Sequence, residues 1–219
     1  MVKKILILCP SRKRNQKHIE TYEHWKNNTN GDSDLLFGLD SDDESNYTRQ
    51  DCLYEVIPKL DGVGINRIIN FLATKYADKY DYIGFIGDDH RFRTKDFEKQ
   101  VLETGKKIVY GNDLLQGKNL PTACFISSDI IKKLGYISPP TLQHLYIDNF
   151  WLELGTGIDS IAYIDEMIIE HCHFSNGKSS VDALYEELNA SSMYEKDRTA
   201  YEEYKKNQFQ NDLEKLYGI

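Results

Sequence analysis

Two carboxylates and an imidazole stand side by side at Asp88, Asp89 and His90, immediately after a short apolar run. That run, Tyr82 to Ile86, is rich in β-branched and aromatic residues, which predicts a buried strand. Carboxylate oxygens and an imidazole nitrogen are donors that suit Mg²⁺ or Mn²⁺. A polar turn in which an aspartate caps the next helix would explain the same residues. The strands and helices predicted around these three residues help to choose between a metal site and a polar turn.

Other predicted strands also end in polar groups. The continuous apolar run of residues 5–8 is typical of a strand covered on both faces, and Pro10, Ser11 and three cations at residues 12–14 follow it. The second strand, residues 34–39, leads into the acidic run of residues 40–44. Either turn could be a solvated loop. However, ligands in open α/β sheets bind beyond the carboxyl ends of the strands, so the repeated pattern indicates a ligand site at one sheet edge.

Strands alternate with helices along most of the chain, which is the pattern of an α/β fold. Further strands are predicted at residues 54–57, 107–110, 120–127 and 160–169, and helices at residues 15–28, 65–76, 94–104, 130–134 and from 147 onward. The remainder of the chain is polar and helical with sparse apolar anchors. We therefore predict one α/β domain over residues 1–182 and a helical C-terminal extension over residues 183–219, packed on or beside it.

Composition restricts the partners and the location. The net charge of −8 argues against a broad nucleic-acid surface, although a local basic face at residues 12–17 with Arg91, Arg93 and Lys95 would survive that average. The four cysteines form no CxxC pair, which favours a reduced cytoplasmic setting. The apolar run near the N-terminus is too short for a signal peptide or a membrane span. We therefore expect no membrane association.

The order of these motifs resembles that of GT-A-fold, family 2-like glycosyltransferases, especially the small stand-alone enzymes found in bacteriophage genomes. The stretches that carry the resemblance are IGDDHRFRT, VYGNDLLQGKNLPTACFIS and HLYIDNFWLELG. It covers about residues 3–182, and the order of the motifs is more specific than any one of them. The resemblance implies a GT-A (Rossmann-like) mixed sheet flanked by helices, a nucleotide-sugar donor that is expected to be UDP-linked, and bound Mn²⁺ or Mg²⁺. A phage-encoded enzyme of this kind would act in the host cytoplasm.

The same resemblance assigns a set of donor contacts. The residues expected to bind the nucleotide-sugar are Pro10, Ser11, Arg12, Asp40, Asp42, Asn66, Arg67, Asp88 and Lys178. Asp40 and Asp42 are alternatives for recognition of the base. Lys178 lies in a Ser/Asn/Gly-rich loop that would bring positive charge to the diphosphate, or that is simply a mobile loop. Asp113 is a further candidate for contact with the donor sugar.

The metal ligands follow from the position of the acidic motif. Asp88-Asp89-His90 stands where the family carries its Asp-x-Asp motif, but His90 replaces the last aspartate. Either Asp88 together with His90, or Asp89 alone, would therefore be the principal ligand. His171 or His173 matches the histidine that many GT-A enzymes bring to the metal from a late strand.

The resemblance also supplies a catalytic base. An inverting transfer needs a group that takes the proton from the acceptor hydroxyl, and family 2-like enzymes place an aspartate at the start of a helix for this purpose. Asp148 fits that position, although a carboxylate there would also cap the helix favourably. Trp151, three residues further on, is either an acceptor platform or a core residue.

Together these features predict a metal-dependent, inverting glycosyltransferase of the hexosyltransferase type. The acceptor would be a modified phage DNA base, a glycan or a protein, and an oligomer is possible. A nucleotidyltransferase could use the same sheet and metal site, but the sequence lacks the expected Gly-rich, Lys-bearing loop. A non-catalytic nucleotide-sugar binding module is the third interpretation.

Overall fold

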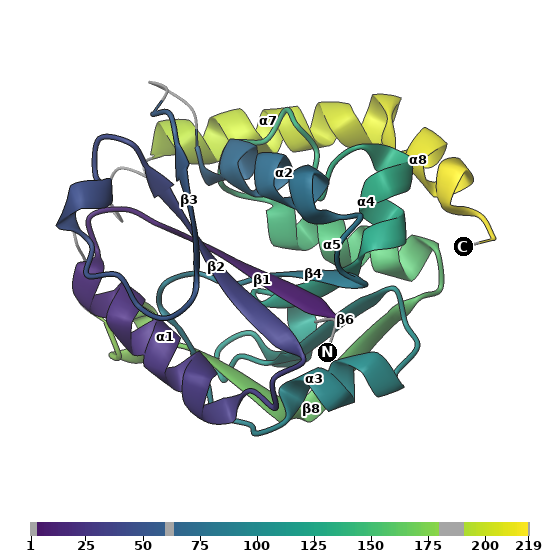
Figure 1. The fold of residues 1–219 in the computed structure, drawn as a ribbon. Helices are drawn as coiled ribbons and strands as arrows, with labels where there is room; N and C mark the ends of the chain where they lie inside the picture. The colour runs from purple at the N-terminus through teal and green to yellow at the C-terminus, as the bar shows by residue number, and fades with distance from the viewer. Residues whose placement is uncertain (1–3, 60–63, 180–190, 219) are drawn as a thin grey trace.

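The computed structural model describes residues 4–59, 64–179 and 191–218, and within them the strands form one mixed sheet of eight (Figure 1). The strands are β1 (Ile5–Ser11), β2 (Ser33–Asp40), β3 (Leu53–Ile57), β4 (Tyr82–Phe85), β5 (His90–Phe92), β6 (Ile108–Asn112), β7 (Cys124–Ser127) and β8 (Ile161–His171). Their order across the sheet is β3-β2-β1-β4-β7-β6-β8-β5. Strands β3, β2, β1 and β4 are parallel, whereas β7 runs antiparallel to both of its neighbours.

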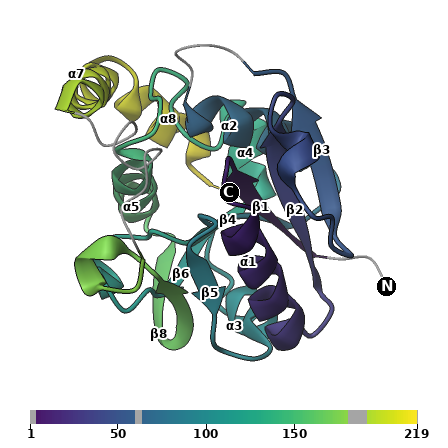
Figure 2. The ribbon, with the colours of Figure 1, turned by 90° about the vertical axis from the view of Figure 1, so that its left-hand side faces the viewer.

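Helices cover both faces of the sheet. They are α1 (Asn15–Asn28), α2 (Ile65–Tyr76), α3 (Phe97–Glu103), α4 (Ser128–Leu134), α5 (Ile147–Gly157), α7 (Ser191–Asn207) and α8 (Phe209–Leu216). Short 3₁₀ helices are η1 (Glu44–Asn46), η2 (Gly117–Asn119) and η3 (Phe174–Asn176). Helices α1 and α3 lie on one side of the sheet, and α2, α4, α5, α7 and α8 lie on the other (Figure 2).

Strand β1 shows why its sequence is apolar without interruption. Successive side chains of a strand point to opposite faces, and both faces are covered here. Leu6 and Leu8 therefore pack in the core beneath α2, α4 and α5, whereas Ile5 and Ile7 pack in the core beneath α1 and α3. All four side chains are fully buried. The strand is thus packed on both faces and paired on both edges, and its carboxyl end leads directly to Ser11 and Arg12.

The C-terminal helices α7 and α8 are part of the core that contains Leu6 and Leu8. Tyr201 and Tyr204 of α7 and Leu216 of α8 are buried in the same cluster as α4 and α5. The buried carboxylate of Asp197 accepts hydrogen bonds from three consecutive backbone N–H groups, those of residues 143–145, at 2.7–2.9 Å. Helix α7 therefore fixes the loop that leads into α5. The predicted boundary at residues 182 and 183 lies outside the described residues.

The predicted α/β fold class is confirmed, and most predicted elements lie within a few residues of the observed ones. Helix α2 occupies the predicted range, and α4 ends at Leu134, followed by Gly135 in the left-handed conformation at φ 82°. Strand β5 was not predicted, and α3 begins only at Phe97, after Asp96 in the left-handed conformation at φ 54°. No helix in the described part of the chain is long and apolar enough to cross a membrane.

Candidate active site

A cavity of about 560 Å³ opens at the carboxyl ends of β1 and β4, between the start of α2 and the start of α5. The residues singled out from the sequence that line it are Pro10, Ser11, Arg12, Asp40, Asp88, Asp89, His90, Asp148, His171 and His173. Apolar side chains such as Ile65, Phe85 and Leu120 complete the wall. This volume lies in the range of small-molecule and cofactor sites. The sheet edge predicted from the sequence is therefore where the polar groups converge.

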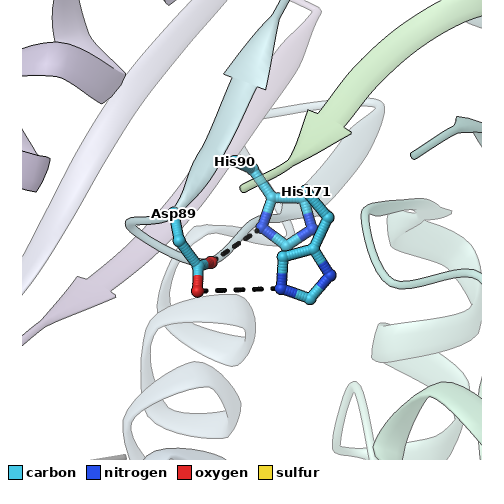
Figure 3. Close-up of side chains that lie close together, drawn as sticks. All are labelled: Asp89, His90 and His171. Atoms are coloured by element: carbon cyan, nitrogen blue, oxygen red, sulfur yellow. Dashed lines mark ion pairs between the residues drawn. The ribbon is translucent and has the colours of Figure 1, made fainter. Parts of the chain in front are cut away.

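Three of these residues form a compact group, Asp89, His90 and His171 (Figure 3). Asp89 Oδ1 lies 3.3 Å from His90 Nδ1, and Asp89 Oδ2 lies 3.6 Å from His171 Nε2. One donor atom from each residue fits within 4.8 Å of the others. Two ligand atoms held at right angles, about 2.1 Å from a divalent ion, lie about 3 Å apart. The group therefore has nearly the spacing of a metal site.

Strand pairing brings the two histidines together from distant parts of the chain. β5 pairs antiparallel with β8, and the register sets His90 directly opposite His171. Their rings stack with centroids 4.3 Å apart. The Cys172 N–H donates to the Asp89 carbonyl oxygen at 2.8 Å, which fixes the turn that carries Asp89 against the end of β8. The backbone thus orients all three side chains.

The electrostatics of the group favour a cation. The Gly87 N–H donates to His90 Nδ1 at 3.1 Å, so that nitrogen carries a lone pair, and Asp89 Oδ1 lies 3.3 Å from the same nitrogen. Burial raises the pKa of Asp89, but the adjacent His171 and His90 outweigh it and hold that pKa well below its ordinary value. For His171, burial lowers the pKa, and the carboxylates of Asp89, Asp113 and Asp148 reverse this and raise it. A half-buried carboxylate beside two imidazoles offers oxygen and nitrogen donors that suit a divalent ion.

Asp88 and His173 lie in the cavity wall but outside this group. Ser11 Oγ donates to Asp88 Oδ2 at 2.6 Å, and Arg14 Nη1 donates to Asp88 Oδ1 at 3.1 Å. Burial and the charge of Asp89 raise the pKa of Asp88 to about 6, although Arg14 opposes them. The His173 imidazole instead begins η3, with Nδ1 2.8 Å from Ser175 Oγ. The geometry therefore favours Asp89, His90 and His171 as the ligands.

Asp148 lies in the first turn of α5 and faces the same cavity. Burial raises its pKa to about 6, because the charge of His171 only partly compensates for the loss of water. Its carboxylate is thus ionised at neutral pH and remains a competent proton acceptor. Trp151 is fully buried against Phe85, and its indole N–H donates to the Ile137 carbonyl at 2.8 Å. Trp151 is therefore a core residue and has no exposed face for an acceptor.

The predicted base-recognition residues are paired with each other. Arg12 donates to Asp40 at 2.9 Å and to both oxygens of Asp42 at 2.7 and 2.9 Å. Asp40 and Arg12 line the cavity, whereas Asp42 lies outside its wall. Charge-assisted bidentate pairs of this kind hold a side chain in place. Nucleotide contacts by Arg12 would therefore have to compete with these carboxylates.

Asn66, Arg67 and Lys178 do not line this cavity. The Asn66 side chain is 1% exposed, and its amide donates to the carbonyls of Pro139 and Leu142 at 2.7 and 2.8 Å. It anchors the loop before α5 and does not reach the ligand space. Arg67 donates to the Pro58 carbonyl, and Lys178 pairs with Glu170. Lys178 lines a separate polar cavity of about 220 Å³, whose wall also includes Asp89.

His144 and Thr122 are among the residues of the cavity wall that sequence reasoning missed. His144 lies four residues before Asp148, and its Nδ1 is buried with no hydrogen-bond partner among the described residues. Burial lowers the pKa of His144, which keeps its ring neutral. Thr122 lies beside His90 in the wall. His144 lies before α5 begins, so helical spacing does not link it to Asp148, and an isolated threonine carries no signal either.

Comparison with known proteins bears on the fold. No family model matches the chain, and no curated protein matches it. S. aureus TarS 1–349 in complex with UDP matches with a TM-score of 0.56 and 11% identity, over 76% of this chain and 59% of that one. The mannosyltransferase PcManGT from Pyrobaculum calidifontis, in complex with GDP-Man and Mn²⁺, matches with a TM-score of 0.59 and 7% identity, over 98% of this chain and 73% of that one.

A third solved structure, Rv0371C from Mycobacterium tuberculosis in complex with manganese, has a TM-score of 0.54 and 10% identity. The match covers 80% of this chain and 96% of that one. The match to the TarS fragment, in contrast, covers less than two thirds of that fragment. The expected GT-A (Rossmann-like) mixed sheet with a helical C-terminal segment is confirmed. At such low identities the likeness defines the fold, and function has to be argued from the site.

Proposed function

We propose that this protein is a metal-dependent glycosyltransferase that moves a sugar from a nucleotide-sugar, UDP-linked in our expectation, to an acceptor hydroxyl with inversion. The observation that carries the proposal is that Asp89, His90, His171 and Asp148 face one cavity at the carboxyl ends of the strands. The fold adds support, since TarS was solved with UDP and PcManGT with GDP-Man and Mn²⁺.

The metal group fits a divalent ion, because a carboxylate and two imidazoles converge with nearly the right spacing. When bound there, Mn²⁺ or Mg²⁺ would act as a Lewis acid on the diphosphate leaving group. Other residues shape the part of the cavity where the nucleotide-sugar would bind. Ser11 and Arg14 hold the Asp88 carboxylate at the end of β1, and apolar side chains such as Ile65 and Phe85 line the rest of the wall. The cavity thus combines a charged end with an apolar wall.

Asp148 is the proposed base for the acceptor hydroxyl. A pKa of about 6 leaves it ionised at neutral pH yet basic enough to accept a proton, which is the condition for efficient general-base catalysis. Its position in the first turn of α5 is fixed by the buried Phe150 and Trp151 that follow it. Because a rigid helix carries it, the carboxylate keeps its place while the acceptor binds.

The charges near the cavity indicate which kind of molecule supplies the acceptor hydroxyl. The predicted basic face is largely neutralised, because Arg12 pairs with Asp42, Arg91 with Glu20 and Arg93 with Glu170. Binding of duplex DNA needs cations that are available to phosphates. We therefore expect a glycan or protein hydroxyl to be a better acceptor than a modified base in duplex DNA.

Release of nucleoside diphosphate tests the proposal. A panel of UDP- and GDP-sugars would be incubated with the protein and Mn²⁺, with water as the surrogate acceptor. Asp89→Asn should abolish release, whereas Asp165→Asn, the same change at an exposed position, should leave it unaltered. Release of pyrophosphate from a nucleoside triphosphate and a sugar phosphate would identify a nucleotidyltransferase instead. Donor binding with no release, even when glycan and protein acceptors are supplied, would identify a binding module.

A further inference from the structure

We propose that Asp113 and Thr122 are positioning residues that form an outer layer behind the metal group. In this arrangement they hold the rings of His90 and His171 so that each presents an unprotonated nitrogen toward Asp89. The inference rests on the metal site of the proposed function. It gives Asp113 a role different from the contact with the donor sugar that the sequence suggested.

The His171 ring lies between two carboxylates. Its Nε2 lies 3.6 Å from Asp89 Oδ2, and its Nδ1 lies 4.0 Å from Asp113 Oδ2. Nδ1 is buried and has no hydrogen-bond partner among the described residues, so the Asp113 oxygen is the acceptor toward which its proton can point. The backbone fixes this approach, because the His171 N–H donates to the Asp113 carbonyl oxygen at 2.9 Å. A proton on Nδ1 leaves Nε2 free to bind a metal.

The His90 ring is connected to the same carboxylate through Thr122. His90 Nδ1 accepts the Gly87 N–H at 3.1 Å, which places the proton of the neutral ring on Nε2. Nε2 lies 3.5 Å from Thr122 Oγ1, and Thr122 Oγ1 donates to Asp113 Oδ2 at 2.7 Å. One carboxylate oxygen thus orders both histidines, one directly and one through a hydroxyl. A metal at Nδ1 would replace the Gly87 N–H as the partner of that lone pair.

The two carboxylate oxygens of Asp113 contact different groups. Oδ1 accepts the backbone N–H groups of residues 115–117 at 2.7–3.0 Å and so holds the loop that contains η2. Oδ2 faces Thr122 and His171. Asp113→Asn can keep the contacts of Oδ1 with its carbonyl oxygen and loses those of Oδ2, because an amide NH₂ is not an acceptor. This substitution therefore separates the support of the histidines from the support of the loop.

Second partners of this kind fix the tautomer and the orientation of a ligating histidine, and their removal typically lowers metal affinity by roughly 10- to 100-fold. We expect that loss in Mn²⁺ affinity for Asp113→Asn. Thr122→Val, which removes only the hydroxyl, should weaken Mn²⁺ binding in the same direction, and Thr122→Ser should restore it. Asp165→Asn is the matched control, since Asp165 is exposed and pairs only with Tyr163 and Asn112 in the described region.

Two measurements test the inference. Calorimetric titration with Mn²⁺ gives the affinity of each variant. Long-range ¹H–¹⁵N spectra of the metal-free protein at alkaline pH, assigned with single histidine variants, give the tautomers. We expect the proton on Nδ1 in His171 and on Nε2 in His90, and a changed His171 tautomer distribution in Asp113→Asn.

The two kinds of failure are distinguishable. Unchanged Mn²⁺ affinity in Asp113→Asn, or a His171 proton on Nε2 in the unaltered protein, would overturn the outer layer while leaving the metal site intact. If the unaltered protein binds no Mn²⁺, the metal dependence of the proposed function fails. In that case the tautomers of the metal-free protein still decide whether Asp113 and Thr122 order the two rings.

Discussion

Asp148→Asn should make the protein more stable and less active at the same time. Burial favours the neutral form of the Asp148 carboxyl and raises its pKa from 3.8 to about 6. The folded state therefore binds the proton more readily than the unfolded state does. As the pH rises through this interval, the unaltered protein loses stability, and above about 6 the whole cost of the buried charge is present. An asparagine carries no charge and avoids that cost.

The size of the gain follows from the pKa difference. The interval from 3.8 to about 6 corresponds to about 3 kcal/mol if the group were wholly buried. Because the carboxylate is partly exposed to the cavity, we expect about 1 to 2 kcal/mol at neutral pH. The difference should shrink to a few tenths of a kcal/mol at about pH 4, where the folded protein is already protonated at this site. Loss of the base should slow transfer by roughly 10²- to 10⁴-fold.

Urea unfolding at several pH values tests the predicted gain in stability, and nucleoside diphosphate release tests the predicted loss of activity. The midpoint should rise in Asp148→Asn at neutral pH with an unchanged dependence on urea concentration, and the two proteins should converge on acidification. Equal midpoints at neutral pH would show that Asp148 is not desolvated. A more stable variant that retains full turnover would show that Asp148 is not the base.

Three further predictions concern the frame of the cavity and the proposed metal site. Asp197→Ala leaves the N–H groups of residues 143–145 without their acceptor, so stability in urea should fall by roughly 3 kcal/mol; an unchanged midpoint would refute this. In Gly64→Ala the new Cβ would lie 2.2 Å from the Gln143 carbonyl oxygen, so calorimetry should show weaker UDP binding and a lower melting temperature; unchanged values for both would contradict it. Asp89→Asn should lose Mn²⁺ binding in the same titration, and retained affinity would exclude Asp89 as a ligand.

The sheet and its helices were predictable because their signals are local. Helix α2 could be placed because Ile65, Ile69 and Leu72 repeat at helical spacing, and Ile69 and Leu72 are fully buried. Strand β5 could not be predicted, because three residues are too few to show a periodic pattern and its partner β8 lies far along the chain. The position of the site followed from the ends of the strands, which a sequence can indicate.

The roles within the site depend on contacts that a sequence does not display. Asp88, Asp89 and His90 are adjacent, yet Ser11 and Arg14 hold Asp88, whereas Asp89 turns toward His171. Only the register of distant strands decides between these directions. Asn66, expected at the nucleotide, is instead fully used by loop carbonyls, since a polar residue near a helix start can serve either purpose.

The most direct test of the account is to follow the anomeric proton of a nucleotide-sugar by ¹H NMR in the presence of Mn²⁺. With an α-linked donor, the account predicts that the donor signal decays and that the β-anomer appears first. Asp148→Asn should slow this decay, and Asp89→Asn should abolish it. First appearance of the α-anomer would contradict inversion with Asp148 as the base. The absence of donor turnover for every nucleotide-sugar, with glycan and protein acceptors supplied, would contradict the proposed glycosyltransferase function.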